Sequence, residues 1–183
     1  ADLTGRLRSV SRGGLVRFGR VDLRTVVEDT RQLAEPTMHT GITVTRELPE
    51  TSILVEGDAG QLQQALTNIV LNARDAMPEG GSIHVSVAIE GAVAAVRIAD
   101  TGPGMDEETR ERIFEPFYTT KPVGSGTGLG MAVTYGIIQG HHGDIAVASE
   151  PGQGTVFTIS LPLLEYADET PEADAFTAGD GNL

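Results

Sequence analysis

The stretch QLQQALTNIVLNARDAM, residues 61–77, combines an apolar and a polar pattern at helical spacing. Its apolar side chains fall on one broad face, which predicts a helix that packs against a core. Asn68, Asn72 and Asp75 stand at i, i+4 and i+7 and form a second stripe. At about 100° per residue this stripe borders the apolar face, so we expect its side chains at the rim of the core. Asp58 precedes the helix as a suitable N-cap.

The rest of the chain alternates between strand-like and helical patterns. Residues 41–48 and 52–57 are typical of single strands, and residues 82–100 and 144–162 are typical of two β-hairpins. This mixed order predicts an α+β fold, a two-layer α/β sandwich in which a mixed sheet carries helices packed on one face. A further helix is predicted from Asp22 to about Pro36, and its apolar pattern consists of Leu23, Val26, Val27 and Leu33. Shorter helices are predicted from 106 to 113 and from 131 to 139.

The composition bounds the class of protein. The 183 residues suffice for one domain, and the absence of cysteine excludes disulfides, thiolate metal sites and cysteine nucleophiles. The net charge of -13 argues against a protein that binds the phosphate backbone of a nucleic acid, which needs a basic face. No apolar run is long enough for a transmembrane helix, and the N-terminus has no signal-peptide pattern. We therefore expect a cytoplasmic chain that contacts neither nucleic acid nor membrane directly.

An acidic residue ends the first hairpin, in VRIADTGPGMD, residues 96–106. Asp100 follows an apolar strand, so its carboxylate would lie at the edge of the core and act there as a hydrogen-bond acceptor. It could accept from an exocyclic amine such as that of adenine, while Gly102 and Gly104 would let the backbone pass close to a flat ring. Taken alone, an ordinary aspartate turn explains this motif better. In the same way, the asparagine stripe alone fits an ordinary polar helix flank.

Glycine occupies every second position of GSGTGLG, residues 124–130, just before a predicted helix. The spacing fits neither the P-loop nor the dinucleotide-binding fingerprint, and the stretch does not directly follow a strand. The free N–H groups of a helix that begins near Gly130 favour an anion, and Lys121, Ser125 and Thr127 could add donors to a phosphate. A flexible surface loop accounts for the same glycines equally well.

Four motifs in a fixed order resemble the catalytic domains of sensor histidine kinases. NIVLNARDAM resembles the N box of that family, DTGPGMD the G1 box, IFEPFYTTK the F box and GSGTGLGMAV the G2 box. The match covers residues 58–162, including a similar final hairpin, and it is most similar to nitrogen-regulator-type and hybrid kinases. The resemblance implies the Bergerat ATP-binding fold, shared with DNA gyrase B and the ninety-kilodalton heat-shock chaperone, with ATP and Mg²⁺ as cofactors.

The resemblance also implies a role for each matching residue. Asp100 would accept from the adenine amine, with Thr155 supporting it through water. Asn72 and Asn68 would hold Mg²⁺ and the phosphates, and Lys121 would approach the γ-phosphate, so these three are the candidate catalytic residues. The candidate ATP-binding residues are Asn68, Asn72, Asp75, Asp100, Gly102, Gly104, Lys121, Ser125, Gly126, Thr127, Gly128, Leu129, Gly130 and Thr155.

The F and G2 boxes would form a lid over the triphosphate. By resemblance, Gly126, Gly128 and Gly130 shape this lid, and Phe114 and Phe117 pack its hinge. Plain core aromatics are an equally good interpretation of the two phenylalanines.

Two positions depart from the family pattern. Many sensor kinases carry a phosphate-binding lysine where this chain has Asp75, so that role is empty or passes to Lys121. The ATP-hydrolysing relatives carry a water-activating glutamate where this chain has Asn68. Without that base we expect slow hydrolysis and transfer of the phosphate to a protein. The alternatives are an ATP hydrolase that acts as a conformational switch and, because of Asp75, a nucleotide-sensing regulatory module.

The resemblance divides the chain into three parts. Residues 1–20 are expected to be the end of the dimerisation and phosphoacceptor helix with its linker, residues 21–164 the catalytic domain, and residues 165–183 an acidic disordered tail or linker. None of the four histidines stands in the acceptor motif, so the acceptor would lie on a helix missing from this chain. The expected partners are that dimerisation domain and a downstream response regulator or receiver domain. We expect a monomer, because dimer contacts would lie in the missing helices.

Overall fold

The computed structural model describes residues 17–122 and 126–164. The expectations for residues 1–16, for Ser125 and for the tail from 165 onwards lie outside these residues. In chain order the elements are β1 (Gly19–Asp22), α1 (Leu23–Ala34), the 3-10 turn η2 (Glu35–Thr37), β2 (Ile42–Glu47), β3 (Leu54–Gly57), α2 (Ala59–Ala76), β4 (Gly81–Glu90), β5 (Val93–Asp100), α3 (Glu107–Arg112), α4 (Gly130–Gly140), β6 (Asp144–Ser149) and β7 (Thr155–Pro162).

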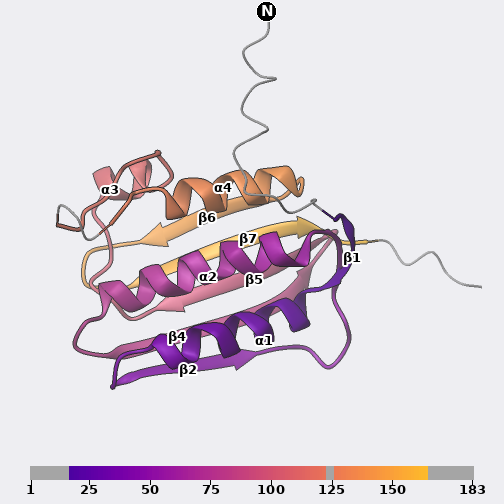
Figure 1. The fold of residues 1–183 in the computed structure, drawn as a ribbon, viewed down its shortest axis with the longest axis horizontal. Helices are drawn as coiled ribbons and strands as arrows, with labels where there is room; N and C mark the ends of the chain where they lie inside the picture. The colour runs from indigo at the N-terminus through magenta and orange to yellow at the C-terminus, as the bar shows by residue number, and fades with distance from the viewer. Residues whose placement is uncertain (1–16, 123–125, 165–183) are drawn as a thin grey trace, which may run out of the picture.

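Five strands form one mixed sheet in the order β2-β4-β5-β7-β6 (Figure 1). β2 runs parallel to β4, and the other neighbours pair antiparallel. The two hairpins predicted from the sequence are β4–β5 and β6–β7. In the sheet β7 lies between β5 and β6, so the last hairpin joins the sheet through β7.

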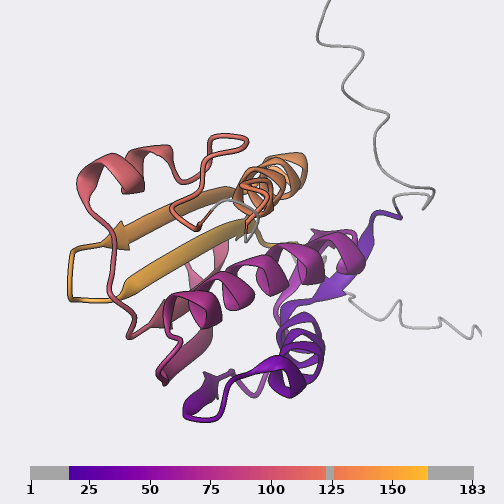
Figure 2. The same cartoon turned by 60° about the vertical axis from the view of Figure 1, so that its left-hand side comes forward.

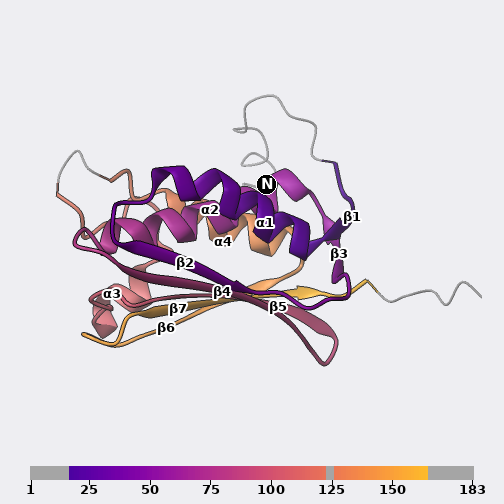
Figure 3. The same cartoon turned by 90° about the horizontal axis from the view of Figure 1, so that it is seen from below.

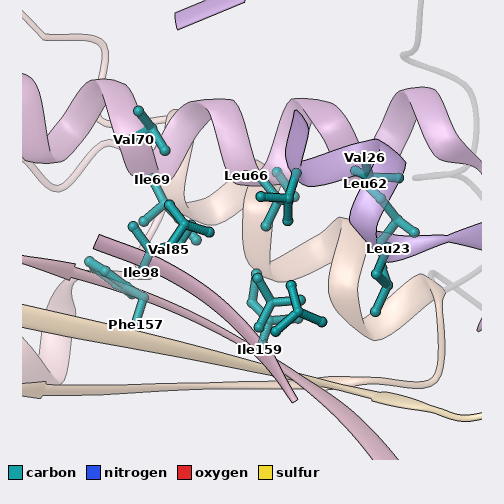
Figure 4. Packing of buried hydrophobic residues seen from close by; sticks show 14 of the residues in the cluster. Leu23, Val26, Leu62, Leu66, Ile69, Val70, Val85, Ile98, Phe157 and Ile159 are labelled. Atoms are coloured by element: carbon teal, nitrogen blue, oxygen red, sulfur yellow. The ribbon is translucent and has the colours of Figure 1, made fainter. Parts of the chain in front are cut away.

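Three helices cover one face of this sheet, as Figure 3 shows for α1, α2 and α4. Leu66 and Ile69 of α2 belong to one buried cluster with Val85, Ile98 and Ile159 of the sheet (Figure 4). β7 alternates buried and more exposed residues along its length, which is the pattern of a strand with one covered face. The α+β two-layer sandwich with helices on one face is confirmed.

Helix α1 buries a face that differs from the predicted one at a single position. The prediction placed Leu33 on the apolar face, but this side chain is 56% exposed. Thr30 and Ala34 are buried in its place. Thr30 is accommodated there because its hydroxyl donates to the Val26 carbonyl at 2.7 Å, which satisfies the polar group inside the core. The assignment of Leu33 to the core is therefore wrong.

A second, two-stranded sheet was not predicted. β1 pairs antiparallel with β3, from Gly19 opposite Gly57 to Asp22 opposite Leu54. Residues 19 and 20, which we expected in a linker, belong to this sheet. Asp22 ends β1 and caps α1, because its carboxylate accepts from the Arg24 N–H at 3.0 Å. The chain thus enters the domain along β3.

One buried histidine joins α2 and α4 at the end of the molecule where α2 begins. His141 follows α4 directly and is 2% exposed. Its Nε2 accepts from the Asp58 N–H at 3.0 Å, and its Nδ1 lies 2.7 Å from the Ile137 carbonyl. Asp58 itself caps α2, as predicted, by accepting from the Gln61 N–H. The ring of Phe18 stacks on His141 with centroids 4.8 Å apart.

Within the two described ranges, no helix combines the length and the apolar character that a membrane crossing requires.

Candidate nucleotide-binding site

A cleft of about 510 Å³ opens between the later turns of α2, the ends of β5 and β7, and the start of α4. The segment between β5 and α4, which contains α3, also contributes lining residues, among them Pro103, Lys121 and Gly126. In Figure 2 this segment leaves the sheet and returns beside the first turn of α4. Candidate residues that line the cleft are Asn68, Asn72, Asp75, Asp100, Gly104, Lys121, Gly126, Thr127, Gly128, Gly130 and Thr155.

Asp100 lines the cleft from the sheet, because it is the last residue of β5 and lies opposite Thr155 of β7. Its carboxylate accepts from the Gly102 N–H at 2.9 Å. Burial raises the pKa of Asp100, and the N–H groups of Gly102 and Thr155 oppose that shift without cancelling it. The Thr155 hydroxyl pairs with the Ser149 hydroxyl at 3.0 Å. The Asp100 carboxylate is thus a half-buried hydrogen-bond acceptor in the lining of the cleft.

Glycine is required at Gly104 and Gly128 by the geometry of the backbone. Both residues have a positive φ, 69° and 63°. A Cβ on Gly104 would overlap the Glu150 carbonyl, and a Cβ on Gly128 would overlap the Phe117 backbone. In addition, the Phe117 N–H donates to the Gly128 carbonyl at 2.9 Å. The backbone therefore leaves no room for a side chain at Gly104 in the G1 box or at Gly128 in the glycine-rich stretch.

The polar stripe of α2 lies along the cleft, as its spacing predicts. Asn68 donates through Nδ2 to the Gly130 carbonyl at 3.1 Å and to the Thr134 hydroxyl at 3.2 Å. Asn72, one turn further on, also lines the cleft. The carboxamide oxygens of such a pair suit Mg²⁺, which usually takes few protein ligands and completes its shell with water and substrate phosphates. Among the described residues there is no cluster of three or more His, Cys, Asp or Glu side chains that would form an all-protein metal site.

Asp75 holds the candidate phosphate ligand Lys121. Lys121 Nζ lies 2.6 Å from Asp75 Oδ2, and Arg74 Nη2 lies 2.6 Å from Asp75 Oδ1. Burial acts to raise the pKa of Asp75, but hydrogen bonds and charge from Lys121 and Arg74 outweigh it and leave the pKa below its ordinary value. The carboxylate is therefore charged at neutral pH and neutralises the lysine at the edge of the cleft.

The two phenylalanines of the F box have different environments. Phe114 packs against Tyr135 and Phe157 with ring centroids 5.6 and 6.4 Å apart. Phe117 is 75% exposed and has a φ of 68°, which is unusual for a residue with a side chain. The expectation that both rings pack a hinge therefore fits Phe114 and is wrong for Phe117.

Two described candidates do not line the cleft. Gly102 supports Asp100 from behind through its N–H. Leu129 uses its own N–H on the Thr127 hydroxyl at 3.4 Å, and its side chain is 38% exposed. The sequence interpretation missed Thr134, which contacts Asn68 from the buried side of α4. Its spacing of i+4 from Gly130 could have placed it on the same helix face.

A comparison with known families gives the class of protein. The model of the family described as histidine kinase-, DNA gyrase B-, and HSP90-like ATPase matches residues 57–165, which is more than half of the chain. The chain belongs to this family. Its curated relatives place it with the kinases: it is 38% identical to sensor kinase CckA of Brucella abortus over 94% of this chain and 20% of the relative. It is 46% identical to sporulation kinase E of Bacillus subtilis over 61% of this chain and 15% of the relative.

Solved structures agree with this placement. The mycobacterial sensor histidine kinase MprB aligns with a TM-score of 0.71 at 28% identity, over 80% of this chain and 98% of that one. Full-length ShkA in complex with AMPPNP aligns with a TM-score of 0.71 at 30% identity, over 82% of this chain and 32% of that one. The chain is thus a catalytic and ATP-binding domain of the sensor histidine kinase type. It spans at most about a fifth of the length of the two curated relatives named above.

Proposed function

We propose that the chain binds Mg-ATP in this cleft and donates the γ-phosphate to a histidine on a dimerisation helix outside this chain. The observation that carries the proposal is the gathering of a half-buried acceptor and a polar rim in one cleft. Asp100 lines the cleft at the end of β5, Asn68 and Asn72 line it from α2, and the glycines before α4 complete the lining. The adenine base of ATP needs a half-buried acceptor for its amine, and the triphosphate needs polar groups. This cleft offers both.

Each residue contributes a definite interaction. Asp100 accepts from the exocyclic amine of adenine, and the G1 turn at Gly104 brings the backbone close to the ring. The oxygens of Asn68 and Asn72 would hold the metal that accompanies the triphosphate. Bound Mg²⁺ would neutralise charge on the phosphate oxygens. Lys121 reaches the same region and offers its three N–H donors to the phosphates.

The transfer step breaks the bond between the γ-phosphorus and the oxygen that bridges it to the β-phosphate. A new bond forms between that phosphorus and the lone pair of an imidazole nitrogen of the acceptor histidine. ADP leaves with the electrons of the broken bond, and the proton on the other ring nitrogen passes to solvent water. The nucleophile comes from the acceptor, so the domain contributes position and electrostatic stabilisation. Asn68 cannot take a proton from water, because a carboxamide is no base at neutral pH. This favours slow hydrolysis and transfer to a protein.

The proposed partners follow from the same reaction. The first is the dimerisation and phosphoacceptor domain of the parent protein, and the second is a response regulator or receiver domain that takes the phosphate from the histidine. A similar kinase, ThkA, has been solved in complex with the response regulator protein TrrA, with a TM-score of 0.70 and 28% identity to this chain. These reactions would take place on the cytoplasmic side, where ATP is available.

Calorimetric titration with ATP, with and without Mg²⁺, tests the nucleotide site. We expect Asp100→Asn to weaken ATP binding by about 1–3 kcal/mol, because the amide nitrogen of asparagine cannot accept from the adenine amine. The same variant should bind GTP no worse than the parent chain does. Equal ATP affinity in the variant and the parent chain would show that Asp100 does not bind the adenine amine.

Transfer itself is tested by adding the folded acceptor domain of the parent protein. Phosphate on the acceptor histidine is the expected result. Many turnovers of ATP in the absence of any acceptor would instead favour an ATP hydrolase of the gyrase or chaperone kind.

A further inference from the structure

We propose that Thr134 is a positioning residue that orients the Asn68 carboxamide and thereby presents Asn68 Oδ1 to the metal and phosphates. The inference rests on the proposed function for its consequence, but its geometric part concerns the nucleotide-free protein. Thr134 lies on the second turn of α4 and is fully buried. It contacts α2 through Asn68 alone among the hydrogen bonds of the described residues.

The hydroxyl of Thr134 has one proton, and the structure assigns it a partner. Thr134 Oγ1 donates to the Gly130 carbonyl at 2.9 Å. A hydroxyl has only one hydrogen to donate, so its hydrogen bond with a second partner must be one that it accepts. The group on Asn68 that lies 3.2 Å away must therefore be the NH₂ end of the carboxamide.

The Gly130 carbonyl likewise requires the NH₂ end of Asn68 to face α4. A carbonyl oxygen only accepts, and it lies 3.1 Å from the same nitrogen of Asn68. Two acceptors thus fix the NH₂ end of Asn68 toward α4. Because the two ends of a carboxamide point apart, Oδ1 is left on the side of the cleft that Asn68 lines. The rotation that would otherwise exchange the oxygen and nitrogen of an asparagine is blocked.

This network explains why asparagine, and not an acid, fits position 68. A carboxylate there would meet the Gly130 carbonyl with two acceptors and no donor, at the first residue of α4. A glutamate at this position would therefore lose both hydrogen bonds that Asn68 donates to α4. Thr134 and Asn68 thus act together: Thr134 orients the Asn68 carboxamide, and Asn68 faces the cleft.

The chain contains a matched control for a purely structural threonine. Thr30 of α1 is also buried, and its hydroxyl also donates to the carbonyl four residues earlier, at 2.7 Å. It differs from Thr134 in lying away from the cleft, beside Leu66 of α2 and Val85 and Ile98 of the sheet. Thr30→Val therefore removes the same kind of helix hydrogen bond without touching Asn68.

The first test measures the Kd of ATP by calorimetry, with Mg²⁺ and with a chelator, for the parent chain and for Thr134→Val, Thr134→Ser and Thr30→Val. Loss of an outer partner of a metal ligand typically costs 10- to 100-fold in metal affinity, so we expect Thr134→Val to lose about that much of the Mg²⁺-dependent gain in ATP affinity. Thr134→Ser keeps the hydroxyl and should keep the gain, and Thr30→Val should keep it as well. An undiminished gain in Thr134→Val, or an equal loss in Thr30→Val, would overturn the inference.

The second test needs no nucleotide. In the free protein the side-chain NH₂ of Asn68, followed by NMR, should exchange with water faster in Thr134→Val than in the parent chain, Thr134→Ser or Thr30→Val. Unchanged exchange in Thr134→Val overturns the geometric claim. If Thr134→Val does not fold by thermal melting, Thr134→Ala replaces it in both tests. A parent chain that binds no ATP sinks the proposed function, whereas the NMR result still decides the role of Thr134.

Discussion

At the scale of single residues, an ion pair restrains Lys121, the lysine proposed to bind phosphate. Asp75 pairs with Lys121 at 2.6 Å and brings a negative charge to the edge of a cleft proposed to take a triphosphate. The pair is about one-third exposed, so it contributes at most about 1 kcal/mol. We expect Asp75→Asn to release Lys121, to remove repulsion from the phosphates and to bind ATP up to about fivefold more tightly.

Calorimetry with ATP and with adenosine measures this effect. Adenosine lacks phosphates, so its affinity should be the same in both proteins. Weaker ATP binding by Asp75→Asn would show that Asp75 holds Lys121 in its productive position and does not compete for it.

The residues of the site divide into those that a sequence can reveal and those that it cannot. Asn68, Asn72 and Asp100 were found because helical spacing and a strand end are local patterns, and all three line one cleft. Thr134 was missed because its role depends on contact between two helices that are far apart in the chain. The Asp75–Lys121 pair was missed for the same reason, although both residues were candidates.

At the scale of elements, an ion-pair cluster joins α1 to the edge strand β2. Glu28 accepts from Arg31 on its own helix at 2.8 Å and from Arg46 of β2 at 2.7 Å. The hydrogen bond from Arg31, opposed by burial and supported by Gln32 and both arginines, lowers the pKa of Glu28 from 4.5 to about 2. A lowered pKa in the folded state stabilises the fold above the unfolded pKa, and this contribution is lost as the pH falls from 4.5 toward 2.

Glu28→Gln should therefore lower the free energy of unfolding at pH 7 by less than about 1 kcal/mol, because the cluster is close to solvent. The difference from the parent chain should shrink as the pH falls through the same window. Urea unfolding at several pH values measures it. Glu47→Gln is the control, because Glu47 follows Arg46 on β2 and its side chain is 82% exposed. A difference that grows on acidification would contradict the assignment.

The elements themselves were largely predictable. α2 and the two hairpins have strong periodic patterns and local turns, and they lie where the sequence places them. β1 was not predicted, because its four residues become a strand only by pairing with β3, which follows a helix and another strand. Leu33 was misplaced because an apolar residue near the buried face of a helix does not always lie on that face. Thr30 is buried there, with its hydroxyl hydrogen-bonded to the Val26 carbonyl.

At the scale of the whole molecule, α2 and α4 contact each other at two places, one at the cleft and one at the opposite end of the two helices. Asn68 and Gly130 meet at the cleft, whereas Asp58 and His141 meet at the end where the chain enters. His141 fits there closely, since a Cβ on Gly57 would come within 2.5 Å of its ring. We call the contact between Asp58 and His141 the joint. Because Phe18 stacks on His141, the joint connects the segment before β1 to both helices that line the cleft.

We expect His141→Ala to lower the free energy of unfolding by about 2–4 kcal/mol, because it leaves a cavity and an Asp58 N–H without its acceptor. His142→Asn is the control: His142 is exposed, and asparagine tolerates its φ of 57°. Since the cleft lies at the other ends of α2 and α4, the folded fraction of His141→Ala should bind ATP within about twofold of the parent chain, a difference of no more than about 0.4 kcal/mol. Denaturant unfolding and calorimetry on the same samples separate the two quantities. A large loss of affinity in the folded protein would mean that the joint where the chain enters and the nucleotide site are energetically coupled through these two helices.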